Sequence, residues 1–123
     1  MQSHDHQQTD PVYKIVREDD WAAACRAGVY LGSADDKRDG FIHLSAAHQL
    51  SDTARKHFKD QRNLILVRFQ ASDLGTGLRW ETSRGGELFP HFYGSLPTVL
   101  AREQNALPLD ADGIPVLPEV VVS

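Results

Sequence analysis

The sequence has a single cysteine, no long apolar run and no dense group of basic residues. Because Cys25 is the one cysteine, the chain can form no intrachain disulfide bond. No apolar stretch approaches the roughly 20 residues that a membrane-spanning helix needs. The formal net charge is −4 and the Lys and Arg residues are scattered, so we expect no membrane partner and no nucleic-acid partner. These absences favour a cytoplasmic protein.

The remaining composition is that of an ordinary globular domain. Hydrophobic residues make up 41% of the chain and charged residues 24%. A length of 123 residues suits one domain with a single core. We expect a disordered lead-in over 1–10 and one domain over 11–123. From about residue 103, where Pro and Asp recur, we expect an irregular C-terminal extension.

Local patterns predict two helices and about six short strands, which together make an α+β domain. Acidic residues followed by an Ala-rich stretch predict a helix over 18–27 that ends at Gly28. Apolar residues three and four apart predict the second helix, from about 46 to 59. Runs rich in β-branched and aromatic residues predict the strands, at 12–16, around His43, and at 63–69, 78–81, 87–93 and 99–102, with a further short strand at 29–31.

Three details of these elements can be tested against a structure. The continuous apolar run Leu64–Val67 predicts a strand that is covered on both faces. Cys25 follows Trp21 by four residues in the first helix, so we expect both side chains to be buried. The stretch 32–40 is polar and is predicted to be a loop.

The segment 39–45, Asp-Gly-Phe-Ile-His-Leu-Ser, places a titratable imidazole in a short strand. Side chains alternate along a strand, so Phe41 and His43 share one face. Ser45 follows at the position expected for the N-cap of the next helix, where anionic ligands tend to bind. A core histidine that merely satisfies a backbone carbonyl would give the same pattern.

Polar and aromatic residues recur over 78–93. Trp80 can stack on a planar ring, and Arg84 can hold a phosphate or a carboxylate through its fork of donors. A turn with exposed charges and a core Trp is the alternative interpretation. His91 and Tyr93 share a strand face, and an imidazole there suits acid–base chemistry.

A metal site is a separate hypothesis. Glu81, His43 and His91 would form a three-ligand set, but no His-x-x-x-His spacing supports it, so we expect no metal.

With these motifs in view, the chain resembles a bacterial family, the domain of unknown function 952, from Val12 to about Pro118. The segments that carry the resemblance are Tyr13–Ile15, Trp21, Gly28, Gly32–Ser33, Asp39–Ser45, Leu78–Glu81 and Phe89–Tyr93. More distantly, the chain is similar to the ADP-ribosyltransferase superfamily, which uses a split α+β fold with an NAD cleft. That similarity implies two helices packed on a split, mostly antiparallel sheet.

In that superfamily three strands supply a His or Arg, then a Tyr or a Ser-containing motif, then a Glu. The similarity assigns Lys14 to the first position, His43 with Ser45 to the second, and His91 with Tyr93 to the third. His91 thus stands where the superfamily has its glutamate, which argues against standard protein ADP-ribosylation. RNA 2′-phosphotransferases work through Arg and His without that Glu, so the similarity implies a nucleotide-handling reaction.

We therefore predict an enzyme that acts on NAD or a related nucleotide, with His43 and His91 as catalytic residues. The expected substrate-binding residues are Lys14, Ser45, Trp80, Glu81, Arg84 and Tyr93. The expected partner is a small molecule, with NAD as a substrate and no resident cofactor assigned. Two alternatives stay open: a non-catalytic module that binds a nucleotide or another small molecule, and a small histidine-dependent hydrolase. The sequence leaves the oligomeric state undetermined.

Overall fold

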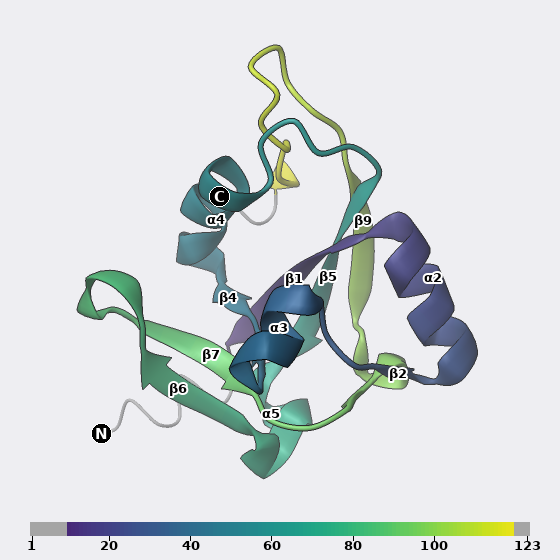
Figure 1. Cartoon of the computed structure of the whole chain (residues 1–123), viewed down its shortest axis with the longest axis vertical. Helices are drawn as coiled ribbons and strands as arrows, with labels where there is room; N and C mark the ends of the chain where they lie inside the picture. Colours follow the sequence, from purple (N-terminus) through teal and green to yellow (C-terminus); the bar gives the residue numbers. More distant parts are fainter. Residues whose placement is uncertain (1–9, 120–123) are drawn as a thin grey trace.

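The structure, a computed structural model, describes residues 10–119 as an α+β fold with antiparallel strand pairing (Figure 1). The helices within these residues are α2 (Glu18–Ala27), α3 (Ala34–Asp39), α4 (Leu50–His57) and α5 (Ala71–Leu74). The strands are β1 (Pro11–Arg17), β2 (Val29–Tyr30), β3 (Ile42–His43), β4 (Ser45–Ala46), β5 (Leu64–Gln70), β6 (Leu78–Thr82), β7 (Leu88–Phe92), β8 (Leu96–Pro97) and β9 (Glu103–Leu107). The α+β class is confirmed, with more elements than the two helices and six strands expected.

The main sheet has the strand order β4-β1-β5-β9, and Figure 1 shows α2 and α4 on opposite sides of it. Leu64 and Leu66 of β5 pack with α4 in one apolar cluster. Val67 and Phe69 point the other way and pack with Trp21 of α2. The apolar run in β5 is therefore covered on both faces, as its composition predicted.

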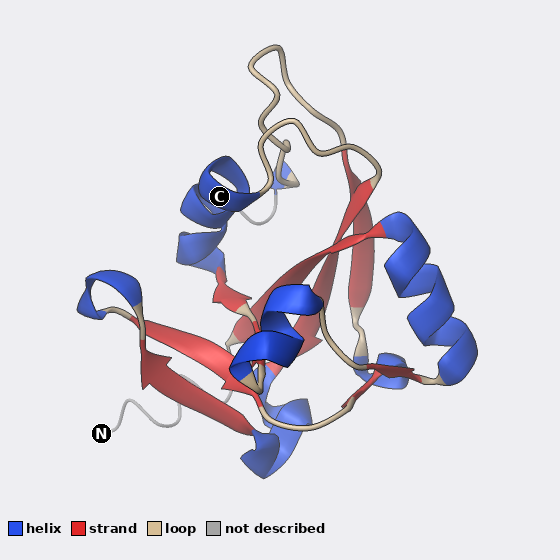
Figure 2. Ribbon diagram, in the orientation of Figure 1, coloured by secondary structure: helices blue, strands red, loops and turns tan. Residues whose placement is uncertain are grey.

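A second sheet, which we call the hairpin sheet, has the order β3-β7-β6. Figure 2 shows its β6–β7 hairpin extending away from the main sheet. Ile42 and Phe92 pair across β3 and β7 and are buried in the apolar cluster that contains Trp21. Leu78 and Trp80 of β6 pack against this cluster. Because side chains alternate along a strand, the intervening residues lie on the opposite face, which we call the outer face. Strands β2 and β8 form a separate two-stranded sheet.

Helix α3 occupies the stretch that was predicted to be a polar loop, and that prediction was wrong. The Ser33 hydroxyl accepts a hydrogen bond from the backbone N–H of Asp36, and the Asp36 carboxylate accepts one from the backbone N–H of Ser33. This reciprocal capping box satisfies the first free donors of a short helix. Gly40 then ends the helix at φ +86°, a conformation that glycine adopts readily.

Two boundaries around the second helix and the last strand also differ from the prediction. Ser45 is not a helix N-cap, because Ser45 and Ala46 pair with β1, and α4 begins only at Leu50 after a 3₁₀ turn over 47–49. The segment 98–100 is a 3₁₀ turn, and the last strand is β9, which pairs with β5. The expected irregular extension from residue 103 therefore begins with a strand of the main sheet.

Cys25 is exposed, so the expectation that it is buried was wrong. Helix α2 buries Trp21 and Ala24, which are three residues apart. Cys25, four residues after Trp21, lies outside this buried stripe. No helix among residues 10–119 is long and apolar enough to cross a membrane. The expected lead-in falls almost wholly on residues 1–9, which lie outside the described residues.

Candidate functional site

A row of three basic side chains crosses the outer face of the hairpin sheet. His43 of β3 lies directly opposite His91 of β7, and Arg79 of β6 lies opposite His91 on its other side. Directly opposed residues in a sheet share a face, so the three side chains are neighbours. The centroids of the two imidazole rings are 5.6 Å apart.

Asp36 is a buried carboxylate that holds His43. It is 2% exposed, and its Oδ1 lies 2.6 Å from the ring Nδ1 of His43 and 3.0 Å from the backbone N of the same residue. The Lys14 ammonium donates a hydrogen bond to Oδ1 at 3.1 Å and lies 2.9 Å from Oδ2, which also accepts a hydrogen bond from the Ser33 backbone N–H at 2.9 Å. Both oxygens are therefore fully used by donors from three segments of the chain.

The charges of Asp36 and Lys14 depend on each other. Burial alone would raise the pKa of Asp36, but the hydrogen bond from His43 and the charge of Lys14 outweigh burial and hold that pKa well below its usual range. Burial lowers the pKa of Lys14, and the Asp36 carboxylate opposes this change. The Lys14 ammonium also donates to the His43 carbonyl at 2.9 Å. Lys14 thus ties the main sheet to the hairpin sheet.

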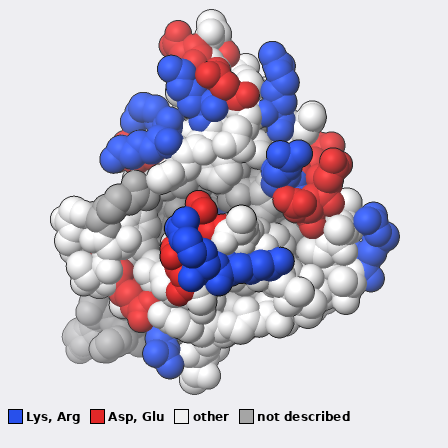
Figure 3. Space-filling model, viewed as in Figure 1, with Lys and Arg blue, Asp and Glu red and all other residues white. Residues whose placement is uncertain are grey.

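The second ring nitrogen of His43 also faces a carboxylate. Its Nε2 lies 3.0 Å from Oδ2 of Asp39, which also pairs with Arg38. The hydrogen bond from Arg38 is the main reason that the pKa of Asp39 is lowered. Figure 3 shows such close pairing of basic and acidic side chains over α3. Only a doubly protonated imidazole can donate to two carboxylates at once, so this geometry suits His43 in its cationic form.

His91 has a single carboxylate partner. Its Nδ1 lies 2.8 Å from Oε1 of Glu81, which also accepts a hydrogen bond from the Tyr93 hydroxyl at 2.8 Å. These two hydrogen bonds lower the pKa of Glu81, and the carboxylate in turn raises the pKa of Tyr93. The Arg79 guanidinium lies over the Tyr93 ring, 4.8 Å from its centroid.

Phe41 covers this pair of histidines. Its ring stacks on the His91 ring with centroids 4.0 Å apart and an interplanar angle of 22°. The ring centroids of His43 and Tyr93 lie 4.6 Å and 5.4 Å from that of Phe41. As a result the His91 side chain is only 6% exposed. A ligand that approaches the His91 ring from this side must displace Phe41.

We call this set of contacting side chains the histidine cluster: Lys14, Asp36, Asp39, Phe41, His43, Arg79, Glu81, His91 and Tyr93.

The comparisons with known proteins identify the family. The family model described as "Protein of unknown function (DUF952)" matches residues 15–102. The chain belongs to this family. The matched segment of the DUF952 chain contains the whole histidine cluster except Lys14, which lies directly before it.

Two solved structures of a relative support the fold. The X-ray crystal structure of protein CC0527 from Caulobacter crescentus is 45% identical, covers 92% of this chain and 99% of its own, and superposes with a TM-score of 0.88. The solution NMR structure of CC0527 is 48% identical, covers 85% of this chain and 90% of its own, and has a TM-score of 0.78. No curated protein matches the chain.

The DUF952 chain brings five of the predicted site residues into the histidine cluster. These are Lys14, His43, Glu81, His91 and Tyr93. Lys14 supports the cluster from β1 of the main sheet, because its ammonium is directed at Asp36 and at the His43 carbonyl.

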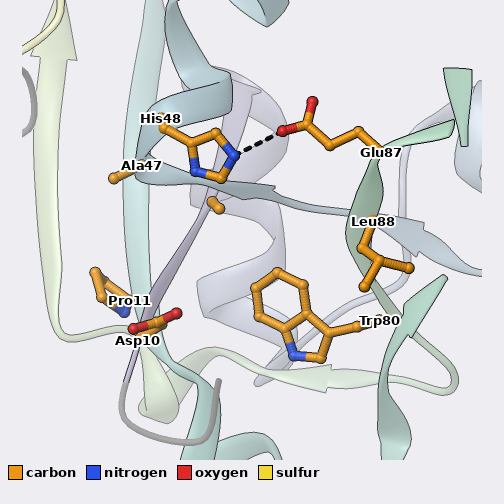
Figure 4. Close-up of a pocket in the computed structure, with 8 residues that line it drawn as sticks. Asp10, Pro11, Ala47, His48, Trp80, Glu87 and Leu88 are labelled. Carbon is orange, nitrogen blue, oxygen red and sulfur yellow. Dashed lines mark hydrogen bonds and ion pairs between the residues drawn. The ribbon is translucent and has the colours of Figure 1, made fainter. Parts of the chain in front are cut away.

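Two other predicted residues lie elsewhere. Ser45 is buried, and its hydroxyl lies 3.2 Å from that of Thr53. Trp80 lies opposite Pro90 in the hairpin sheet, one residue out of phase with Arg79 and His91, so its side chain lies on the other face. There it lines a separate hollow, seen in Figure 4. The side chain of Arg84 lies outside the described part of the chain.

Sequence reasoning missed four members of the cluster as site residues: Asp36, Asp39, Phe41 and Arg79. The spacing of Ser33 and Asp36 is that of a capping box and would have predicted α3. Alternation along β6 would have placed Arg79 on the face of Glu81. Among the described residues, no group of three His, Cys, Asp or Glu side chains is placed to hold a metal ion.

Proposed function

We propose that this DUF952 protein is an enzyme that performs general acid–base catalysis on a nucleotide or a related phosphate-bearing small molecule, with NAD as the first candidate. One observation carries the proposal: two imidazoles lie 5.6 Å apart, and the Nδ1 of each is bound to a carboxylate of its own. Acid–base catalysis needs positioned groups that exchange protons near neutral pH, and histidine is the side chain best suited to this.

The two histidines are suited to different roles. When Nδ1 of His91 donates to Glu81, its Nε2 keeps a lone pair that can accept a proton from a substrate. No hydrogen bond to that Nε2 comes from any side chain that the structure describes. His43 has a carboxylate at each nitrogen and is suited to act as the cationic partner. In the proposal His91 is the base, and His43 is the acid or stabilises negative charge.

Arg79 supports an anionic substrate. It is exposed and lies beside His91 in the same row. A guanidinium binds phosphate through two parallel N–H donors, so Arg79 is suited to hold a phosphate next to the base. NAD is the candidate because it carries a pyrophosphate and because of the similarity to ADP-ribosyltransferases described above.

The position of Phe41 favours a second candidate, a non-catalytic binding module. Phe41 stacks on His91 and leaves the His91 side chain 6% exposed, so a ligand could bind Arg79 and Tyr93 without reaching the base. Ligand binding without chemical turnover would identify this function.

The test combines binding with turnover. The melting temperature is measured with NAD, ADP-ribose and AMP at millimolar concentration, and ³¹P NMR follows each compound over time. We expect at least one of them to raise the melting temperature and to be converted. Arg79→Gln should abolish the rise, whereas Arg55→Gln, at a 56% exposed arginine on α4, should retain it. His91→Gln should retain binding and lose turnover. If none of the three compounds binds or reacts, the nucleotide assignment is wrong.

A further inference from the structure

A hollow of about 510 Å³ lies beside the face of the hairpin sheet that carries Trp80, opposite to the outer face with the histidines. Three parts of the chain line it: the start of β1, the β4–η1 segment (η1 is the 3₁₀ turn Ala47–Gln49), and the β6–β7 hairpin. Its volume is in the range typical of small-molecule sites. The histidine cluster contributes none of its lining residues.

The walls of the hollow suit a flat ligand. Figure 4 shows Pro11 on one side and the Trp80 indole on the other, with open space between them. Leu88 lies next to Trp80 and is 44% exposed. A planar ring that stacks on the indole face and contacts Leu88 would remove apolar surface of both residues from water. The shape therefore favours a planar group stacked on Trp80.

The charges of the lining favour a cation. Among the described residues that line it, the ionisable ones are Asp10, Glu87 and His48, and none is Lys or Arg. The His48 Nε2 lies 2.7 Å from Glu87 Oε2 and closes one end, as Figure 4 shows. The Asp10 carboxylate has no ion pair with any side chain that the structure describes. A carboxylate in a hollow that also presents an indole face favours an organic cation, because both the carboxylate and the ring face attract positive charge.

We propose that this hollow binds a small planar organic cation, an aromatic amidinium or guanidinium, which stacks on Trp80 with its charge directed at Asp10. This site is independent of the proposed catalytic function. On the outer face both histidines are paired with carboxylates and the exposed Arg79 suits an anion, whereas the hollow suits the opposite charge. Two ligands of opposite charge would therefore bind on opposite faces of one hairpin sheet.

Benzamidine, benzamide and benzoate have nearly the same planar shape but are a cation, a neutral molecule and an anion. Comparing their binding therefore separates the effect of ligand charge from that of ligand shape. The measurement is the NMR signal of the indole N–H, which the chain has at two positions, Trp21 and Trp80. Trp21 is 3% exposed in the core and serves as the internal reference. We expect benzamidine to shift the Trp80 signal saturably, benzamide to bind about tenfold more weakly, and benzoate to have no effect.

Variants locate the site. Asp10→Asn should weaken benzamidine binding several-fold, whereas Asp35→Asn, at a 74% exposed carboxylate on α3, should leave it unchanged. His91→Gln should also leave it unchanged, so a failed catalytic hypothesis does not affect this result. The proposal is overturned if the Trp80 signal does not move with benzamidine, or if benzamide binds as tightly as benzamidine.

Discussion

Replacing Asp36 with Asn tests whether the buried carboxylate holds the histidine cluster together. The two side chains have nearly the same size, so the change removes charge without leaving a cavity. Oδ1 of Asp36 accepts from Lys14 and from the ring and the backbone of His43, and Oδ2 accepts from Ser33 and lies 2.9 Å from the Lys14 ammonium. Whichever way the amide is turned, its NH₂ group faces donors, and the Lys14 ammonium loses its countercharge.

We expect Asp36→Asn to lower the free energy of unfolding strongly, because Asp36 is buried and the Lys14 side chain is largely buried. Asp36 is 2% exposed and the Lys14 side chain 11%. Removing one partner of a buried ion pair typically costs about 3–5 kcal/mol of unfolding free energy, and we expect Asp36→Asn to fall in that range. An exposed ion pair would cost less than about 1 kcal/mol. The size of the loss in unfolding free energy therefore distinguishes a buried ion pair from an exposed one.

The cost should depend on pH with a definite sign. The pKa of Asp36 is lower in the folded state than in the unfolded state, so its stabilisation is complete above about pH 4 and is lost as the pH falls below that. Asn does not titrate. The difference in stability between wild type and Asp36→Asn should therefore be largest near neutral pH and should narrow below about pH 4.

Urea unfolding followed by circular dichroism at several pH values measures both effects. The matched control is Asp35→Asn in the same helix, where the carboxylate is 74% exposed and a change within about 0.5 kcal/mol is expected. In the double variant Lys14→Met with Asp36→Asn, the cost should be clearly smaller than the sum of the two single costs. A cost of Asp36→Asn below about 1 kcal/mol, or one that stays constant from neutral to acidic pH, would refute the reasoning.

Three further changes probe single contacts. Glu81→Gln removes the carboxylate that raises the pKa of Tyr93, so a tyrosinate absorbance titration should show this pKa falling towards its ordinary value; an unchanged titration would contradict the hydrogen bond. Gly32→Ala should destabilise the fold by more than about 1 kcal/mol in urea unfolding, because Gly32 has φ +108° and a new Cβ would lie 2.7 Å from the Cβ of Asp36. Cys25→Ser should change the melting temperature little, since Cys25 is exposed; a large drop would mean that the thiol is packed.

Several elements were predictable because their signals are local. The acidic start and glycine stop of α2 are sequence features, and Gly28 indeed caps the helix at φ +87°. The apolar run in β5 predicted burial on both faces. In contrast, β9 is polar and largely exposed, so no apolar alternation marks it as a strand. Only its pairing with β5 makes it one.

Part of the candidate site was predictable in the same way. Alternation along short strands places Phe41 with His43 and His91 with Tyr93, and the contacts of Phe41 agree with both pairs. Alternation within one strand cannot tell which residues of another strand lie opposite. Alternation separates Trp80 from Glu81, but the sequence does not show which of these two faces the histidines share.

By itself the sequence determined the class of the fold, the ends of its first helix and the polar character of its short strands, because these depend on neighbours a few residues apart. The tertiary structure decided that His43 lies opposite His91, that Asp36 binds His43, and that Trp80 lines a hollow on the other face. The physical reason is strand register. Register is set by packing between segments far apart in the chain, and a shift of one residue would reverse every face.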